Sequence, residues 1–476
     1  MLGLLMLMKK LTYLLLLSIL PFGFCMGDET PVVPPNEDVH PTVPSIKATP
    51  SDSTNSDVDT VNYVLHDNLR LGQKIDRILN SKLNINAKKL SICIFDISTN
   101  SYITRHNDEE LMAPASCMKL LTAVTAIDRL GQNYAFCDSL FIKGEVDANG
   151  TLHGDMILKM DDDPLFWDFR QWAKAVQQRG IRRVEGSIIM NLARRDILKP
   201  HPTDKPWDIQ YHKLPLMLKG EKYIKSIFKS TLASRGIRIK EEPFLPNDPN
   251  LNEYWTSVRE NNKGNDFDLD GMLRKMALEN ASNGAECIAA TSNPILSVIN
   301  PMLIYSSNMK AESVFYHLDN IYSGMWQRHS QYGKSPHEVE RFLKEKMGID
   351  TKSQGFVIND GSGLSPMNRL NANFIVRLLL WSYNNRPLRD ILIQEALAVP
   401  GIPGRKGSLK NRMATGFARG RIYCKTGTLV STGSSSLAGF AQGRNGHWYA
   451  FAIMHKDTPV WNARDFQDRI CREIVR

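Results

Sequence analysis

Residues 113–127 constrain the fold more than any other stretch, because their pattern predicts a buried helix with a reactive pair at its start. Pro114 suits the first turn of a helix, and Gly131 suits the position just past its end. Ser116 and Lys119 are three residues apart, so both side chains leave the same side of the first turn. The wide apolar face consists of Leu120, Leu121, Val124, Ile127 and Leu130.

The serine–lysine pair can perform nucleophilic chemistry if the lysine is neutral. Apolar surroundings remove hydration from an ammonium group, lower its pKa and allow the amine to take the Ser116 proton. A helix-capping serine beside a lysine whose ammonium group reaches water gives the same four-letter pattern. The pattern also recurs at Ser226–Lys229 and Ser307–Lys310. Assigning a catalytic function to Ser116 therefore requires a second and a third motif in a defined order.

Two further motifs follow in that order. Ser306 and Asn308 form an S-x-N pattern in a predicted loop, and Lys425, Thr426 and Gly427 form the single K-T-G in a predicted strand. S-x-N alone is weak, since it also occurs elsewhere in the chain. S-x-x-K, S-x-N and K-T-G on helix, loop and strand are together typical of penicillin-recognising serine enzymes.

The chain resembles D-alanyl-D-alanine carboxypeptidases/endopeptidases of the penicillin-binding protein 4 type, peptidase family S13. The segments that carry the resemblance are 114–123, 308–312, 359–365, 401–409, 425–429 and 436–440. It implies an α+β fold: a transpeptidase/β-lactamase-like domain, in which helices flank an antiparallel sheet, with a large, mainly β-rich inserted domain. It also implies a serine-type D-Ala-D-Ala carboxypeptidase, with DD-endopeptidase activity as a further expectation.

The resemblance implies roles for four catalytic residues. Ser116 would attack the carbonyl of the penultimate D-alanine and form an acyl-enzyme, with Lys119 as its proton acceptor. Ser306 would relay a proton to the leaving amine. Asn308 would orient Lys119 and the substrate amide.

It also implies a substrate-binding strand of Lys425, Thr426, Gly427 and Thr428. Lys425 and Thr426 would bind the terminal carboxylate, a task suited to a cation beside a hydroxyl. The backbone N–H groups of Ser116 and Thr428 would form the oxyanion hole. No metal or organic cofactor is expected. Peptidoglycan stem peptides would be the substrates, and β-lactam antibiotics would be covalent inhibitors.

The predicted domain order starts with a signal peptide or anchor at 1–27, where two lysines precede a short apolar run. A disordered linker follows at 28–62. The catalytic domain would comprise 63–140 and 287–476, interrupted by an inserted domain at 141–286. Within the insert we expect a hairpin around Asn149-Gly150, short strands over 184–190 and 237–239, and loop over much of 199–284. The segment 160–162 departs from the family pattern, which usually has glycines before Asp-Pro.

Composition limits the possible partners. The net charge is +9 at pH 7, but Lys and Arg are scattered, so nucleic acid is not expected. The leader predicts export to the periplasm or cell envelope, with membrane attachment only if it is uncleaved or lipidated. Cys93, Cys117 and Cys424 lie in apolar patterns that favour buried free thiols.

Two alternative functions remain open at this stage. A serine β-lactamase of class A would need a glutamate after S-x-N to activate water, and Glu340 in a charged helical stretch is the nearest candidate. A non-catalytic envelope protein could keep the fold and bind partners through its insert. Intact motifs argue against a decayed site.

Overall fold

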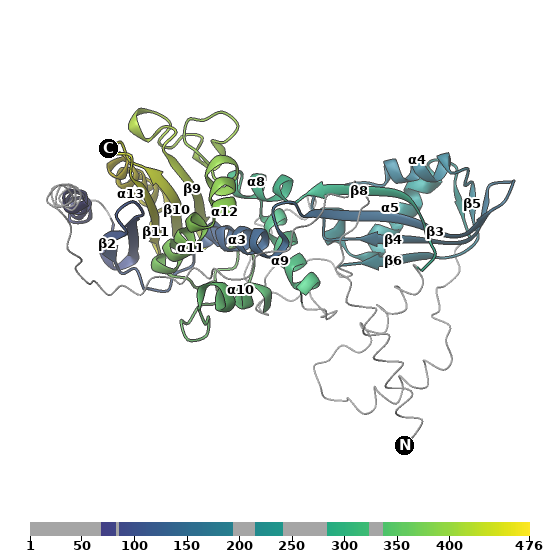
Figure 1. The fold of residues 1–476 in the computed structure, drawn as a ribbon, viewed down its shortest axis with the longest axis horizontal. Coiled ribbons are helices and arrows are strands. Elements are labelled where there is room, and N and C mark those ends of the chain that lie inside the picture. Colours follow the sequence, from purple (N-terminus) through teal and green to yellow (C-terminus); the bar gives the residue numbers. More distant parts are fainter. Residues whose placement is uncertain (1–67, 82–84, 194–214, 241–282, 323–336) are drawn as a thin grey trace, which may run out of the picture. The chain divides into compact units, whose positions relative to one another are not determined.

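The computed structural model describes residues 68–81, 85–193, 215–240, 283–322 and 337–476 (Figure 1). The predicted signal peptide at 1–27 and the linker at 28–62 lie outside this part of the chain. Within it, no helix is both long enough and apolar enough to span a bilayer.

A five-stranded antiparallel sheet has the order β2-β1-β11-β10-β9. Its strands are β1 (Leu90–Asp96), β2 (Ser101–His106), β9 (Ile422–Leu429), β10 (Ser434–Gln442) and β11 (Trp448–His455). All five are expected from the sequence: the runs 90–97 and 102–104 predict a hairpin, and the alternating or apolar runs 420–429, 436–441 and 448–454 predict adjacent antiparallel strands. Both predictions are confirmed. β9, which carries Lys-Thr-Gly, is an edge strand, and within the described chain its outer side makes only one bridge, between Cys424 and Ala398.

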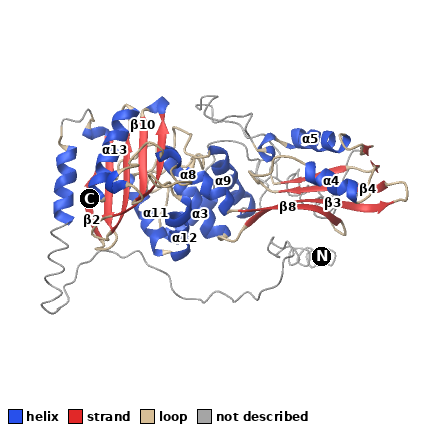
Figure 2. Ribbon diagram, turned by 90° about the horizontal axis from the view of Figure 1, so that it is seen from above, coloured by secondary structure: helices blue, strands red, loops and turns tan. Residues whose placement is uncertain are grey.

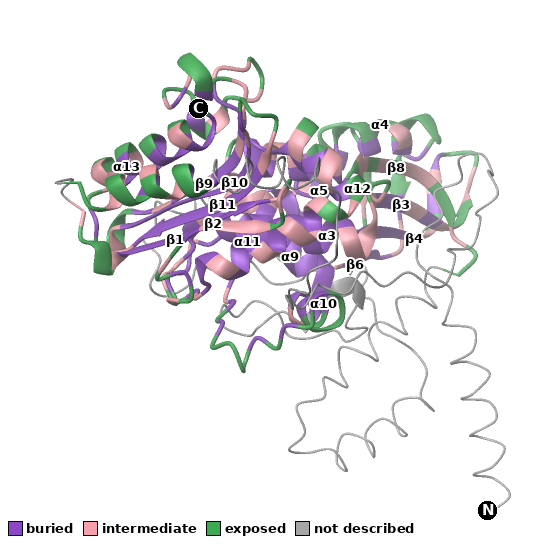
Figure 3. Cartoon of the chain, turned by 60° about the vertical axis from the view of Figure 1, so that its left-hand side comes forward, coloured by how far each residue is buried: buried purple, intermediate pink, exposed green. Residues whose placement is uncertain are grey.

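Helices cover both faces of this sheet, because alternate strand residues point to opposite sides (Figure 2). Ala438 and Phe440 of β10 pack into a core with α3 (Met118–Leu130) and α11 (Ala372–Asn384). Leu437 packs on the other face against α13 (Val460–Ile474). Figure 3 shows that β10, β11 and α3 are almost entirely buried. The predicted α+β class with helices on both sides of an antiparallel sheet is confirmed.

Further helices complete the layer around α3. Its direct neighbours are α8 (Leu296–Ile304), α9 (Asn308–Tyr322), α10 (His337–Met347) and α12 (Arg386–Asp390). Besides α4 (Arg170–Gln178) and α5 (Glu221–Ala233), the other helical segments of the described chain are 68–79, the π-helical turn Ile391–Ala396 and the short 3-10 turns Ala87–Lys89, Ala115–Cys117, Leu216–Lys219, Gly407–Leu409, Gly416–Ala418 and Val430–Thr432.

A second, six-stranded sheet lies between the two parts of the predicted catalytic domain in sequence. Its strands are β3 (Ala135–Val146), β4 (Thr151–Met160), β5 (Arg183–Val184), β6 (Ile188–Leu192), β7 (Arg238–Ile239) and β8 (Glu286–Pro294). β3 and β4 form the expected hairpin around Asn149-Gly150. β3 and β8 run across the predicted boundaries at 140/141 and 286/287, so the proposed division would cut both strands.

The expectation of loop over 199–284 is wrong for α5 (Glu221–Ala233). Ile224, Phe228 and Leu232 recur every fourth residue and bury one stripe of this helix in the core of the second sheet. Their polar neighbours lowered the average hydrophobicity and hid the stripe. The segment 184–190 forms parts of two strands, β5 and β6, and the short strand expected over 237–239 is confirmed as β7. The helix α4 (Arg170–Gln178), which was not predicted, buries Trp172 in the same core.

The first prediction concerns α5. Phe228 is fully buried and packs its ring edge-on against Phe169, with ring centroids 5.0 Å apart. We expect Phe228→Ala to lower the free energy of unfolding by about 3–5 kcal/mol, because it removes buried apolar surface and leaves a cavity. Chemical denaturation followed by circular dichroism measures this. Lys222→Ala on the exposed face is the control, and equal stability of the two variants would contradict the packing.

Candidate active site

Ser116 lies in the 3-10 turn Ala115–Cys117, which leads directly into α3. Two contacts fix this turn to the sheet: Ser436 Oγ of β10 donates to Pro114 O at 2.6 Å, and Cys117 Sγ donates to Lys425 O of β9 at 3.3 Å. Ala115 has a φ of 46°, a left-handed conformation that disfavours a residue with a side chain. The backbone just before Ser116 is therefore strained, and packing holds it in place.

Close approach of neighbouring segments requires glycine at two positions. A Cβ atom on Gly427 of β9 would lie 2.1 Å from Ser436 Oγ and 2.8 Å from Pro114 O. A Cβ atom on Gly363, whose φ is +80°, would lie 1.8 Å from Ala115 O. Both glycines let backbone approach the Ser116 turn at distances that a side chain would forbid.

Lys119 is fully buried and makes three hydrogen bonds. Its Nζ lies 2.9 Å from Ser116 Oγ, 2.8 Å from Asn308 Oδ1 and 2.6 Å from the carbonyl oxygen of Ser362. A carbonyl oxygen and an amide oxygen can only accept, so they bind N–H groups in either protonation state of the lysine. A neutral amine has two N–H groups and one lone pair, so the lone pair would face the Ser116 hydroxyl.

The electrostatics favour that neutral state. Burial lowers the pKa of Lys119 well below its usual value, and the nearby Lys425 cation lowers it further. Asp360 and Glu312 act in the opposite direction. Burial also lowers the pKa of Lys425, to about 8. The Lys425 cation thus helps to keep Lys119 neutral, although desolvation is the larger cause.

The two residues of the S-x-N motif differ in their contact with Lys119. Asn308 is the first residue of α9 and reaches Lys119 through its side-chain oxygen. Ser306 lies just before α9, is half-buried and has a φ of 60°. The hydrogen bonds of Lys119 within the described chain go to Ser116, Asn308 and Ser362, and none goes to Ser306.

The K-T-G-T strand lies beside the Ser116 turn. Lys425 is fully buried, and its Nζ donates to the backbone oxygen of Thr426 at 2.8 Å. Thr426 and Thr428 are half-buried and share one face of β9, opposite to Gly427. Thr428 Oγ1 donates to Gly427 O at 2.8 Å.

Sequence reasoning missed three groups around Lys119: the Ser362 carbonyl, Glu312 and Asp360. The Gly-rich segment 359–365 was interpreted only as a tight turn and a family segment. Asp360 accepts hydrogen bonds from the backbone N–H groups of Gly363 and Ser365 at 2.6 and 2.5 Å, which shapes that turn. Glu312 Oε1 accepts from Ser362 N at 3.0 Å and so orients the peptide whose carbonyl binds Lys119. Alternation of Asp, Ser and Gly was the available signal.

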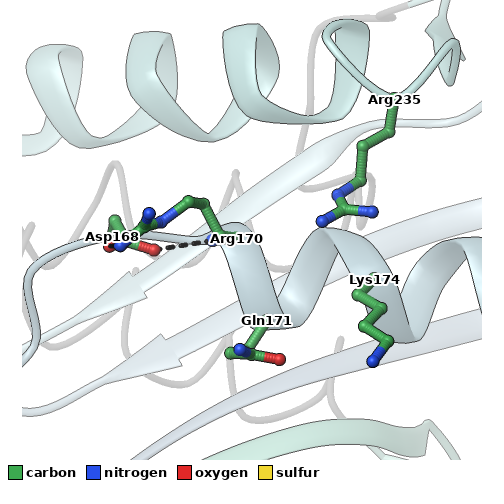
Figure 4. A pocket seen from close by; sticks show the side chains of 5 residues that line it. All are labelled: Asp168, Arg170, Gln171, Lys174 and Arg235. Carbon is green, nitrogen blue, oxygen red and sulfur yellow. Dashed lines mark hydrogen bonds and ion pairs between the residues drawn. The ribbon is translucent and has the colours of Figure 1, made fainter.

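Other candidate features carry less chemistry. A hollow of about 610 Å³ on the second-sheet region is lined by Asp168, Arg170, Gln171, Lys174 and Arg235 (Figure 4). Arg170 pairs with Asp168 at 2.8 Å, and the lining contains no nucleophile beside a base. Within the described ranges, no group of three His, Cys, Asp or Glu side chains is arranged to hold a metal ion. Cys93, Cys117 and Cys424 are buried free thiols, as expected.

The second prediction concerns Glu312. Burial and the neighbouring Asp360 raise the pKa of Glu312 to about 8. The folded protein therefore holds a proton that the unfolded chain releases above its ordinary pKa of about 4.3, and stability falls as the pH rises between these values, by about 1.4 kcal/mol for each pKa unit. Glu312→Gln removes this titration. We expect the stability difference between wild type and Glu312→Gln to change across that window in urea denaturation.

The exposed Glu145→Gln variant is the matched control and should show a constant difference from wild type. A constant difference for Glu312→Gln as well would contradict the buried, protonated carboxyl.

Comparison with known proteins agrees with this geometry. The model of the D-Ala-D-Ala carboxypeptidase 3 (S13) family matches residues 71–201 and 271–473. The chain belongs to this family. The match includes the Ser116 turn, the start of α9 and the β9 strand, and it places the protein in the class of serine-type D-Ala-D-Ala carboxypeptidases.

Individual relatives have low sequence identity to this chain but match it over most of its length. A D-alanyl-D-alanine carboxypeptidase of Actinomadura sp. (strain R39) is 24% identical over 454 residues, which cover 81% of this chain and 80% of the relative. Penicillin binding protein 4 of Haemophilus influenzae is 16% identical, with a TM-score of 0.57 over 80% of this chain and 96% of that one. The structure of that protein in complex with a β-lactam has a TM-score of 0.59 and 16% identity, over 85% of this chain and 99% of that one. The S13 enzyme thus shares the fold of penicillin binding protein 4.

Proposed function

We propose that Ser116 is the nucleophile of this carboxypeptidase, that Lys119 is its proton acceptor, and that the substrates are peptidoglycan stem peptides ending in D-Ala-D-Ala. The observation that carries the proposal is the position of Lys119 Nζ, 2.9 Å from Ser116 Oγ, with its other contacts on obligate acceptors. This arrangement aims the amine lone pair at the hydroxyl whose proton must leave.

Acylation begins when Ser116 Oγ attacks the carbonyl carbon of the penultimate D-alanine and Lys119 takes the hydroxyl proton. Backbone N–H groups of Ser116 and Thr428 bind the oxyanion, and one such donor typically contributes about 3 kcal/mol to transition-state stabilisation. The C–N bond then breaks, and Ser306 passes the proton to the departing amine of the last D-alanine. In deacylation, water attacks the ester carbonyl and gives one proton to Lys119, which passes it to Ser116 Oγ as the ester C–O bond breaks.

Substrate orientation is assigned to the remaining residues. Lys425 and Thr426 bind the carboxylate of the last D-alanine, and Gly427 allows β9 to approach the Ser116 turn. Asn308 holds Lys119 and the substrate amide. The β-lactam complex of the Haemophilus influenzae protein supports β-lactams as covalent ligands of this site. A peptidoglycan substrate in turn supports a location in the cell envelope, reached by export.

A class A β-lactamase mechanism has less support. Glu340 lies on α10 and accepts a hydrogen bond from Thr351 Oγ1 at 3.2 Å. Glu312 follows Asn308 and lies near Lys119, but its raised pKa keeps it protonated at neutral pH, so it is a poor base for activating water. A purely non-catalytic role is also disfavoured, because a buried lysine costs several kcal/mol unless its environment favours a neutral amine.

The third prediction tests the nucleophile. Wild type should release D-alanine from a peptide ending in D-Ala-D-Ala, and Ser116→Ala should lower kcat at least about 10³-fold, because no acyl-enzyme can form. A penicillin should add its mass to the wild-type peptide that contains Ser116 and to no peptide of the variant. Cross-linked muropeptides in the same assay report endopeptidase activity. Undiminished release by Ser116→Ala would contradict the assignment.

The fourth prediction concerns pH. Lys119 must be neutral and Lys425 protonated for acylation, and burial places the pKa of Lys425 at about 8. The second-order rate constant for acylation by a fluorescent penicillin should therefore rise to a maximum and then fall as the pH passes about 8. The apparent pKa values of this profile belong to the pair of lysines rather than to either one alone. Stopped-flow measurements with the free antibiotic as control provide the profile. A rate constant that keeps rising to about pH 10 contradicts the role of Lys425.

A further inference from the structure

Arg464 of α13 reaches the substrate-binding strand from the face opposite to Ser116. Its Nη2 atom donates to Thr428 Oγ1 at 3.3 Å. The Thr428 hydroxyl uses its own proton on Gly427 O at 2.8 Å, so it is an acceptor toward the arginine. One guanidinium N–H thus binds the last residue of the Lys-Thr-Gly-Thr segment.

Arg464 forms no ion pair with the residues that the structure describes. No carboxylate of the described chain lies within 4.0 Å of its guanidinium, and only one of its five N–H donors binds a described protein group. Neighbouring Arg412 differs, since its Nε and Nη2 atoms bind Asp468 at 2.9 and 2.7 Å. Asp468 thus forms its ion pair with Arg412 rather than with Arg464. Partial burial and repulsion from Arg412 lower the pKa of Arg464, while the Asp468 carboxylate acts in the opposite direction.

Packing fixes the position of this cation. Gln467, one helical turn further along α13, donates from Nε2 to Ser435 Oγ at 3.2 Å. Ser435 of β10 is the direct partner of Thr428 in the β9–β10 ladder. Phe466 and Ile470 bury the inner face of α13 against the sheet. The helix is therefore held where Arg464 stands over Thr428 and Gln467 over Ser435.

We propose that Arg464 is a substrate-binding residue that holds the terminal carboxylate of the substrate together with Thr426 and Thr428. This inference rests on the proposed function of the site. Thr426 and Thr428 share the face of β9 that Arg464 approaches, and β9 is the edge strand of its sheet, with a single bridge on its outer side, at Cys424, within the described chain. A guanidinium binds a carboxylate through two parallel N–H groups, and it stays charged at every working pH. Lys425 is buried against Thr426 O and loses its charge at mildly alkaline pH.

The test compares a peptide ending in D-Ala-D-Ala with the same peptide as a C-terminal amide. We expect Arg464→Ala to lower kcat/KM for the acid about tenfold to hundredfold, the usual effect of removing a charged hydrogen-bond partner, and to leave the amide unchanged. Arg469→Ala is the matched control: it lies on the exposed side of α13 and pairs with Asp465 at 2.8 Å. It should retain the wild-type ratio of acid to amide.

A wild-type ratio in Arg464→Ala, or equal losses on both peptides, would overturn the proposal. Arg464→Lys keeps the charge without the planar fork and should recover part of the acid activity. If Arg464→Ala has a lower melting temperature than Arg469→Ala, the variants Arg464→Lys and Arg464→Gln provide the same comparison of acid and amide. Failure of the proposed function is distinct, because wild type would then cleave neither peptide and form no penicillin adduct on Ser116.

Discussion

The hydrogen bonds of the Lys119 amine are the interaction on which the site depends. An ammonium group in a fully buried position costs several kcal/mol unless carboxylates or hydrogen bonds compensate for the lost water. Ser362 and Asn308 supply two acceptors, and the carboxyl groups nearby are too few to hold the lysine as a cation: burial keeps Glu312 largely protonated. The third hydrogen bond of the Lys119 nitrogen is with the Ser116 hydroxyl. Reactivity thus follows from burial.

The fold assembles this environment from segments far apart in sequence. The Ser116 turn is tied to β9 and β10 through Cys117 and Ser436, and the 360–365 turn is shaped by the carboxylate of Asp360. Gly427 and Gly363 allow two backbones to approach that turn closely. Because these contacts are buried, a small shift of β9 would move Thr426 and Thr428, to which the proposed function assigns substrate binding, relative to Ser116.

Sequence patterns predicted the parts of this protein whose physics is local. The helix after Ser116 and the strands β9 to β11 were found because their apolar periodicity is strong. α5 was missed because Ile224, Phe228 and Leu232 alternate with lysines and serines. The contact with the Ser362 carbonyl could not be predicted, because every residue has a backbone oxygen and the sequence does not show which one reaches Lys119. Arg464 was missed for a third reason: only the packing of α13 brings it to Thr428. The order of three short motifs predicted the candidate site, and the roles assigned to its side chains stay predictions.

The protonation state of Lys119 is the central claim, and NMR of protein labelled with ε-¹³C-lysine measures it directly. Lys119→Met and Lys425→Met variants assign the two unusual signals. The account predicts that the Lys119 carbon reports a neutral amine at pH values where exposed lysines are still charged, with a midpoint well below its usual value. A Lys119 signal that titrates together with the exposed lysines near pH 10.4 would contradict it.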